Sequence, residues 1–392
     1  MDALTTPLNW QRVRLGDILE LLTDYHANGS YELLKNNVTL LKHIDFAIMI
    51  RTTNFENNDF KNDLIYINKK AYEFLSKSKV FAGDILVNKI ANAGTAYFMP
   101  KLNQPVSLGM NLFLLRIKPN YNNFFIFKQI ANYERVLKTF ANGSATKTIT
   151  KNVIKNLLIP LPPLNEQIAI ANILSGLDHY LYTLDALILK KEDVKKALSF
   201  ELLSQRKRLK GFNQAWQKVR LGDICEIVKG QQINKISLNN TDKYPVINGG
   251  IDFLGYTNKF NVSKNTIAIS EGGTCGYVRF MTSNFWSGGH NYSLQKISNK
   301  VNNLCLYHIL KSYEKDIMKL GVGSGLKNIQ LKALKDFEIL LPPLNEQIAI
   351  ANILSALDNE IISLKNKKRQ FENIKKALNH DLMSAKIRVL EK

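Results

Sequence analysis

The residue types that could do chemistry in this chain are few, and their spacing forms no catalytic set. Cys225, Cys275 and Cys305 lie far apart without paired histidines, so they predict neither a disulfide framework nor a zinc site. No GxxxxGK(S/T) phosphate loop is present, and the two Pro-Pro pairs are flanked by leucine, unlike the (Asp/Asn/Ser)-Pro-Pro-aromatic segment of an amino-methyltransferase. The six histidines are scattered. We therefore expect no catalytic residues, no metal site and no cofactor.

The nearest approach to a phosphate-binding glycine loop is the sequence GVGSG at residues 321–325. A dinucleotide fingerprint requires a strand before the glycines, but a helical pattern precedes this segment. The corresponding residues 141–145 of the first half have the sequence ANGSA, which lacks two of the glycines. We interpret the segment as a turn.

The net charge of +20 over 392 residues predicts a polyanionic partner. A Lys-rich and Asn-rich composition that reflects a biased genome is the alternative. Phosphates are contacted by Lys and Arg, whereas base edges are contacted by Arg, Lys, Asn, Gln, Ser or Thr. Polar and basic residues of these types cluster with glycine in two segments of the chain, which are therefore the candidate contacts of such a partner.

The candidate DNA-binding residues form two sets and one matched pair. The first set is His26, Asn28, Ser30, Lys35, Arg51, Lys89 and Asn92. The second set is Lys229, Gln231, Gln232, Asn234, Lys235, His290 and Asn291. The matched pair is Lys147 and Lys327, which suit phosphates because a shared contact cannot carry differing specificity. For any single member a solvated loop position is the alternative, so the prediction concerns the sets.

Two phrases occur twice, and they divide the chain into halves. Residues 161–178, LPPLNEQIAIANILSGLD, return at 341–358 with one difference, and WQRVRLGDI at 10–18 returns as WQKVRLGDI at 216–224. The offsets are 341 − 161 = 180 and 216 − 10 = 206, so the first interval is 26 residues longer. A Gly-Ser…Lys…Ile match at 143–149 and 323–329 also has offset 180, which places the extra length before it.

Each copy of the longer phrase predicts a helix that begins after a Pro-Pro pair, because proline ends the preceding element. Apolar residues then recur in steps of three and four, which is a heptad seam. Its members include Leu174, Leu177, Leu181, Leu184, Leu354, Leu357, Ile361 and Leu364. Such a helix is about 60 Å long at 1.5 Å per residue. Two near-identical helices can pair with each other, and ordinary core packing is the alternative for either one.

Polar residues at the two helix starts are the same in both copies. They are Asn165, Glu166, Gln167, Asn172, Asn345, Glu346, Gln347 and Asn352. These positions either dock a partner protein or make capping and spacer contacts, since a glutamate favourably complements a helix N-terminus in any case. Both alternatives stay open from the sequence.

Short β-rich runs broken by Gly and Asn precede each long helix, at 85–87, 266–269 and 277–280, and helical patterns follow at 124–140 and 303–320. We therefore expect the α+β class, with domains at 1–160 and 211–340 and long helices at 161–210 and 341–392. Near-identical helices that carry dissimilar globules indicate two different recognition heads on a common spacer.

In this arrangement the chain resembles the specificity (S) subunits of type I restriction–modification systems. The W…LGDI openings, the GDIL…N-AG and GS…K…I segments and the two LPPLNEQ-IA-IL phrases carry the resemblance. The segment DYHANGSYELLKNN…MIRTTNF resembles one recurring type of target-recognition domain. The match covers nearly the whole chain, in family order, twice.

The resemblance implies double-stranded DNA as the partner and two target-recognition domains, each reading one half of a bipartite, asymmetric DNA sequence. It further implies an antiparallel coiled-coil spacer with pseudo-twofold symmetry, which sets the gap between half-sites and docks two methyltransferase (modification) subunits and, through them, any restriction subunits. S-adenosylmethionine, ATP and Mg²⁺ would belong to those partners.

The opening residues MDALTTPLNW contain no basic region followed by an apolar run, so we expect no signal peptide, and no apolar run approaches the roughly 18 residues of a membrane span. A cytoplasmic protein without membrane contact is expected. Two other hypotheses remain: a scaffold whose heads bind proteins, against which the charge argues, and an enzyme in its own right, which would need the missing motifs.

Overall fold

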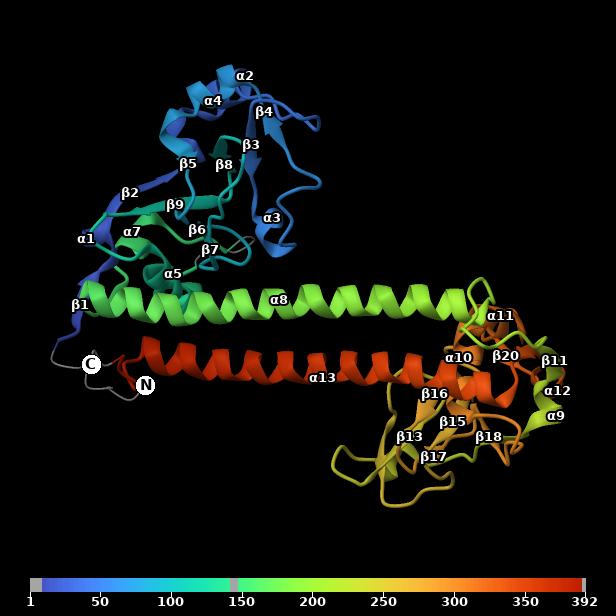
Figure 1. The fold of residues 1–392 in the computed structure, drawn as a ribbon. Helices are drawn as coiled ribbons and strands as arrows, with labels where there is room; N and C mark the ends of the chain where they lie inside the picture. Colours follow the sequence, from blue (N-terminus) through green and yellow to red (C-terminus); the bar gives the residue numbers. More distant parts are fainter. Residues whose placement is uncertain (1–8, 142–146, 390–392) are drawn as a thin grey trace. The chain divides into compact units, whose positions relative to one another are not determined.

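The computed structural model describes residues 9–141 and 147–389, and these divide into two compact units. The first unit comprises residues up to 182 together with those from 369 onward, and the second comprises residues 183–368. Each unit holds one α+β globule, the start of one long helix and the end of the other (Figure 1).

The first unit opens with β1 (Gln11–Arg14), which pairs antiparallel with β10 (Leu158–Leu161) just before the first Pro-Pro pair. The short helices α1 (Leu15–Ile18) and α7 (Lys151–Lys155) flank this pair. The inner sheet has the order β2-β9-β6-β7, spanning Leu19–Asp24, Leu112–Ile117, Ile85–Asn88 and Ala96–Phe98. The chain thus returns to its own entrance before the long helix begins.

An outer sheet with helices on it completes the first unit. Its order is β4-β3-β8-β5, spanning Tyr66–Ile67, Ala47–Ile50, Val106–Leu108 and Lys79–Val80. The helices around it are α2 (Tyr31–Asn37), α3 (Thr52–Glu56) and α4 (Lys69–Phe74), with 3-10 turns η1 (Tyr25–Asn28) and η2 (Ser76–Ser78). Strand β3 alternates between two cores: Ile48 and Ile50 pack toward the inner sheet, and Ala47 and Met49 pack toward α2 and α4.

The second unit repeats this plan with fewer parts. Strand β11 (Gln217–Arg220) pairs with β21 (Glu338–Leu341), flanked by α9 (Leu221–Ile224) and α12 (Leu331–Lys335). The inner sheet β12-β18-β15-β16 spans Glu226–Lys229, Asn291–Gln295, Thr266–Ser270 and Val278–Met281. The outer sheet β14-β13-β17 spans Gly255–Thr257, Tyr244–Ile247 and Trp286–Ser287.

The length difference between the halves is visible in the outer layer. The second unit has the 3-10 turn η3 (Lys235–Ser237) and a three-stranded outer sheet, whereas the first has α2, α4 and a fourth strand there. The hairpin of β19 (Gly321–Val322) and β20 (Asn328–Ile329) contains the GVGSG segment. Residues 323–325 form the turn, as predicted, and residues 321–322 belong to a strand.

Each predicted helical pattern before the long helix is two helices. The first unit has α5 (Asn123–Asn132) and α6 (Glu134–Thr139), and the second has α10 (Asn303–Ser312) and α11 (Glu314–Lys319). The break falls at Tyr133 (φ −90°, ψ 7°) and at Tyr313 (φ −88°, ψ 7°), where the backbone leaves α-helical geometry. The buried faces of α5 and α10 pack against the start of the long helix of their own unit.

The long helices are α8 (Leu164–Leu203) and α13 (Leu344–Met383), each of 40 residues. Within the first unit Tyr180 packs on Phe371 with ring centroids 4.6 Å apart, and within the second Lys191 pairs with Glu360 at 2.8 Å. Residue numbers rise along one helix as they fall along the other, so the pairing is antiparallel. The seam is confirmed: its buried members are Leu174, Leu181, Leu184, Leu354 and Ile361, and its half-buried members are Leu177, Leu357 and Leu364.

Candidate DNA interface

The inner sheets of the two units place corresponding residues at the same edge, where three loops meet. On the outer strand of each sheet, Asp24 lies opposite Phe113 and Lys229 lies opposite Tyr292. Asp24 and Lys229 are each the last residue of their strand, and their partners Phe113 and Tyr292 are each the second residue of theirs. Asp24 and Lys229 are therefore structural equivalents, with opposite charges.

A second pair of equivalents follows the central strand. The backbone N–H of Lys89 donates to the carbonyl of Asn111 at 2.8 Å, and the N–H of Glu271 donates to the carbonyl of His290 at 2.8 Å. The carbonyls of Lys89 and Glu271 in turn accept from Ile149 and Ile329. Lys89 and Glu271 thus occupy one position, again with opposite charges.

In the first unit this edge carries a carboxylate held by two lysines. Asp24 accepts from Lys89 at 3.2 Å and from Lys151 at 3.1 Å. Burial on its own raises the pKa of Asp24, but Lys151 and Lys89 outweigh it and lower that pKa below its usual value. The Lys89 side chain is only 12% exposed, and its ammonium lies over the Phe113 ring, 5.3 Å from the centroid. The charge of Lys89 is therefore balanced inside the unit.

In the second unit the signs are exchanged. Lys229 donates to Glu271 at 2.7 Å, and the Tyr292 hydroxyl donates to the same oxygen at 3.1 Å. Burial, together with the neighbouring carboxylate, raises the pKa of Tyr292 to about 12. His290 Nδ1 lies 4.0 Å from the other oxygen of Glu271, and its side chain is half-exposed. Here a histidine and a lysine present their polar ends at the surface around a buried carboxylate.

Glycines let the loops of this second edge approach one another backbone to backbone. Gly249 has φ +80°, and a Cβ on it would lie 2.6 Å from the carbonyl oxygen of Gly272. A Cβ on Gly230 would lie 2.2 Å from the carbonyl oxygen of Gly288. The loops that carry Gln232, His290 and Glu271 can interlock only because side chains are absent at these points.

The structure assigns internal roles to several residues of the first predicted set. Asn28 is a correction: its Nδ2 donates to the Tyr25 carbonyl and to Ser78 Oγ, and its Oδ1 accepts from the Lys77 N–H at 2.9 Å. Because every polar atom of the amide has a partner within the unit, Asn28 joins η1 to η2 and is not available to read a base. Ser30 caps α2 by accepting from the Leu33 N–H.

Other members of that set are engaged more loosely. Arg51 donates to the Asp63 carbonyl at 2.9 Å and is half-buried, and Asn92 donates to Glu56 at 3.3 Å on the surface. Lys89 is a second correction, since it is nearly buried in the pair with Asp24. The exposed members are His26, Ser30, Lys35 and Asn92.

In the second set Asn291 is a correction as well. It is 2% exposed within β18, and its Oδ1 accepts from Ser270 Oγ at 3.4 Å, so it belongs to the core of the sheet. Asn234 starts η3 by accepting from the Ile236 N–H. Gln231, Gln232, Asn234, Lys235 and His290 are exposed, as are Lys147 and Lys327 at the matched site, whose Gly143 and Ser144 lie outside the described residues.

The polar residues at the helix starts resolve into two kinds, and the buried kind fits the alternative of contacts within the chain. Glu166 is buried, accepts from Trp10 Nε1 at 3.3 Å and binds the Arg388 guanidinium through both oxygens at 2.7 and 3.0 Å. Arg388 comes from the segment after α13, and its pKa is raised by the hydrogen bond to Glu166. The first unit is thereby closed by what we call a clasp.

The second unit has the same clasp from equivalent residues. Glu346 is 1% exposed, accepts from Trp216 Nε1 at 3.0 Å and binds Arg208 through both oxygens at 2.9 and 2.6 Å. The two arginines are separated by the repeat offset, 388 − 208 = 180, but they lie outside the two repeated phrases and were not predicted. The tryptophan and the glutamate of each clasp do lie in those phrases.

The glutamines beside these glutamates are internal too. The Oε1 of Gln167 accepts from the Asn122 N–H at 3.0 Å, and the Oε1 of Gln347 accepts from the Asn302 N–H at 2.7 Å. Their Nε2 atoms donate to the carbonyls of Pro162 and Pro342. Glu166, Gln167, Glu346 and Gln347 therefore hold each globule to its helix, whereas Asn165, Asn172, Asn345 and Asn352 lie exposed.

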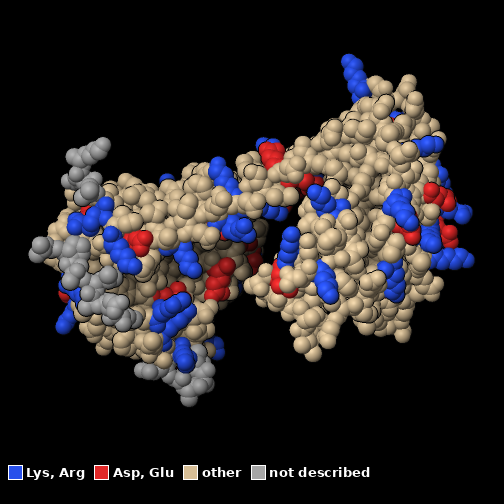
Figure 2. Space-filling view, turned by 90° about the horizontal axis from the view of Figure 1, so that it is seen from below, with Lys and Arg blue, Asp and Glu red and all other residues tan. Residues whose placement is uncertain are grey.

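The described residues hold no cluster of three or more His, Cys, Asp or Glu side chains that could bind a metal ion. No helix in the same part of the chain is long and apolar enough to cross a membrane. Lys and Arg outnumber Asp and Glu on the face that Figure 2 draws, in line with the net charge. The exposed lysine, glutamine and histidine side chains of the second edge can donate hydrogen bonds to an acceptor.

Comparison with known proteins decides the family. The model of the type I restriction modification DNA specificity domain matches residues 7–191 and again 213–373. The chain belongs to this family. It is a type I restriction–modification specificity subunit with two target-recognition domains, the non-catalytic component that recognises DNA and assembles with the other subunits of such a system.

Relatives from an archaeon cover the whole specificity subunit. The chain is 29% identical over 416 residues to a protein of Methanocaldococcus jannaschii named for the MjaX type I restriction enzyme specificity subunit, covering 97% of each chain. It is 24% identical over 432 residues to the MjaVIII specificity subunit of the same organism, covering 99% of this chain and 95% of that one.

Solved structures show the same fold. The S subunit of a type I restriction–modification system from Mycoplasma genitalium superposes with a TM-score of 0.69 at 21% identity and covers 96% of both chains. A chain from a study of complex assembly and conformational transition in a type I system gives 0.51 at 17% identity, with 96% and 98% covered. The α+β class with two long antiparallel helices and an internal repeat is confirmed.

Proposed function

We propose that each unit of this specificity subunit reads one half of a bipartite, asymmetric DNA sequence. The observation that carries the proposal is the exchange of charge at equivalent strand ends, Asp24 with Lys89 in one unit and Lys229 with Glu271 in the other. Two units that shared a target would present the same groups there. A common backbone with opposite side chains suits two different base sequences.

The long helices would set the distance between the half-sites. Each begins in one unit and ends in the other, and 40 residues extend about 60 Å. In this proposal residues 1–160 and 211–340 are the two recognition domains, and residues 161–210 and 341–392 are the two spacer helices. The exposed faces around Asn172 and Asn352 would dock two methyltransferase subunits and, through them, any restriction subunits.

The chemistry would belong to those partners. S-adenosylmethionine would bind the methyltransferase subunits, and ATP with Mg²⁺ would bind restriction subunits, all of them in the cytoplasm. Exposed lysines such as Lys35, Lys147, Lys235 and Lys327 would contact phosphates, while Gln231, Gln232 and His290 would lie against base edges.

Methylation mapping tests the proposal. The chain is expressed with its cognate modification subunit in cells that lack other adenine methylation, and the modified bases are mapped by single-molecule sequencing. The expected result is one motif of two short blocks separated by a fixed gap. Replacing residues 216–337 with the corresponding segment of another specificity subunit should change one block only; a change in both blocks, or a motif without a gap, would contradict it.

A further inference from the structure

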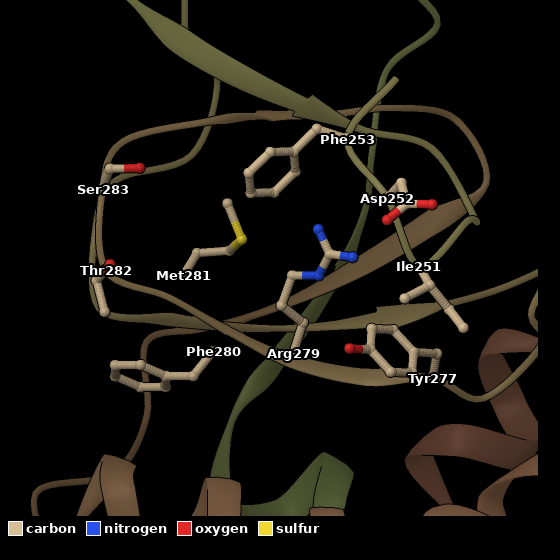
Figure 3. Close-up of a pocket in the computed structure, with 9 residues that line it drawn as sticks. All are labelled: Ile251, Asp252, Phe253, Tyr277, Arg279, Phe280, Met281, Thr282 and Ser283. Carbon is tan, nitrogen blue, oxygen red and sulfur yellow. The ribbon is translucent and has the colours of Figure 1, made fainter. Parts of the chain in front are cut away.

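A cavity of about 350 Å³ lies in the second unit between the loop that follows β13 and strand β16. Figure 3 shows Arg279 at its centre, with Phe253, Tyr277 and Asp252 around it. The guanidinium carbon lies 5.0 Å from the Phe253 centroid and 5.4 Å from the Tyr277 centroid. Two aromatic rings thus orient the guanidinium while its N–H edge faces the cavity.

Arg279 and Asp252 are the charged groups of this cavity. Among residues 9–141 and 147–389, neither Arg279 nor Asp252 forms an ion pair or a side-chain hydrogen bond. Asp252 is exposed, and Phe253 is 44% exposed on the same loop. A half-buried guanidinium stacked on aromatic rings without a carboxylate partner is a recognition group that awaits an acceptor.

The first unit has no such group at the equivalent position. Tyr97 lies opposite Leu86 in its sheet and Arg279 lies opposite Ala268, and these two strand positions correspond in register. Tyr97 stacks on Phe55, with centroids 4.9 Å apart and ring planes 22° apart. Phe55, in α3, and Phe253, in a loop, both follow the outer-sheet strand that has a parallel neighbour, so an aromatic stack in one unit becomes a cationic site in the other.

The loop that carries Asp252 and Phe253 begins at the edge of the inner sheet where Gly249 approaches Gly272. It leaves β13 at Ile247 and passes Gly249, whose absent Cβ would lie 3.2 Å from His290 Cβ. The loop thus connects the edge at His290 with the cavity along the chain, and the inference takes one DNA duplex to contact both. In this respect the inference rests on the proposed function.

We propose that Arg279 and Asp252 together read one G·C base pair of the second unit's half-site through the major groove. Arginine donates two parallel hydrogen bonds to guanine O6 and N7, and aspartate accepts from the N4 amino group of the paired cytosine. A phosphate is a poorer occupant because Asp252 would repel it. Guanine and cytosine present the acceptor and the donor side by side, which matches this pair of groups.

The test uses the full chain in complex with its modification subunit. Arg279→Ala, Arg279→Lys, Asp252→Asn and the control Lys315→Ala, which removes an exposed charge on α11, are compared by methylation mapping and by thermal melting. At one position of one block, Arg279→Ala and Arg279→Lys should each lower the preference for G·C by roughly 5- to 150-fold. Asp252→Asn should weaken the same position, and Lys315→Ala should leave the motif unchanged.

Lysine keeps the positive charge of arginine but lacks its planar pair of parallel N–H donors. Arg279→Lys therefore separates base readout, which needs that pair, from phosphate binding, which needs only the charge. An unchanged motif in both Arg279 variants would overturn the inference. A uniform loss of methylation at all sites in Arg279→Ala that Arg279→Lys restores would overturn it in favour of a phosphate contact. Failure of the wild-type complex to give a bipartite motif would overturn the proposed function itself. If the wild-type motif is bipartite and stays the same in the Arg279 variants, only the inference about Arg279 fails.

Discussion

At the edge of the inner sheet the two units carry opposite charges on corresponding backbones. At the edge of the inner sheet the ladder, the loop hydrogen bonds and the strand ends correspond residue by residue, yet the carboxylate and the ammonium change places. At the helix starts the opposite holds, because the clasps use the same side chains in both units. Positions that hold a globule to its helix are thus kept, and positions at the sheet edge vary in chemistry.

The largest expected effect is on the clasps, where the units should behave alike. Arg208→Ala leaves Glu346 buried without its cation, and Arg388→Ala does the same to Glu166. Arg208→Ala should destabilise the second unit by about 3 kcal/mol, which corresponds to a melting temperature lower by roughly 6–12 °C, and Arg388→Ala should lower the melting temperature of the first unit in the same way. Calorimetry of the purified chain measures this.

Matched controls lie beside each arginine. Arg206→Ala and Lys386→Ala remove neighbouring exposed charges and should leave the melting temperature within about 1 °C. An equal loss in the controls would show that net charge, and not the clasp, is responsible.

The exchanged ion pair should be convertible from one polarity to the other. Lys229→Asp places a second carboxylate at an exposed position beside the buried Glu271 and, after solvent screening, should cost about 1 kcal/mol. The double variant Lys229→Asp, Glu271→Lys recreates the polarity of the first unit and should recover most of that loss. Thermal unfolding of the two single variants and the double variant gives the coupling energy, and a double variant no more stable than Lys229→Asp would contradict the equivalence of the two edges.

Acid should affect the second unit before the first. His308 and Lys128 are equivalent by the repeat offset, but burial lowers the pKa of His308 to about 4, while Lys128 pairs with Asp178 at 3.0 Å. His308 binds a proton below about pH 6.5 in the unfolded chain but only near pH 4 in the folded unit. The free energy of unfolding therefore has its full value above about pH 6.5 and decreases as the pH falls toward 4.

Between those two pH values the free energy of unfolding should change by about 1.4 kcal/mol per pH unit. Unfolding of the second unit can be followed by hydrogen exchange of α10 at several pH values, with His308→Asn as the variant that lacks the proton uptake. The same slope in His308→Asn would assign the acid sensitivity to other groups.

The smallest expected effect is at the matched lysines. Lys147→Ala and Lys327→Ala should each weaken DNA binding by the complex irrespective of base sequence and reduce the slope of log K against log salt by roughly 0.9. A salt titration by fluorescence anisotropy measures this, with Lys315→Ala as the control. A changed methylation motif in either variant would show base readout at these positions.

Much of the architecture follows from the sequence because repeats and proline breaks are local features. The seam of α8 and α13, the strands near 85–87 and 266–269 and the turn at 323–325 were predictable on that basis. The breaks at Tyr133 and Tyr313 were not, because neither residue is a helix breaker by type.

The site residues were harder to predict because their roles depend on strand register. Asn28 and Asn291 have side chains that suit base readout. Asn28, however, links two 3-10 turns by hydrogen bonds, and Asn291 is buried in a strand. Asp24 and Glu271 were overlooked since an acidic residue is an unexpected partner for DNA. Only the pairing of distant strands brings each one against its lysine.

The central claim is that two heads of different specificity share one pseudo-symmetric frame, and making the heads identical tests it most directly. In this chain residues 10–157 replace residues 216–337, with junctions at equivalent positions beside the β1–β10 and β11–β21 pairs. Methylation mapping with the cognate modification subunit should yield an inverted repeat of the first block across the original gap. A motif that keeps the second block, or two copies in the same orientation, would contradict the account.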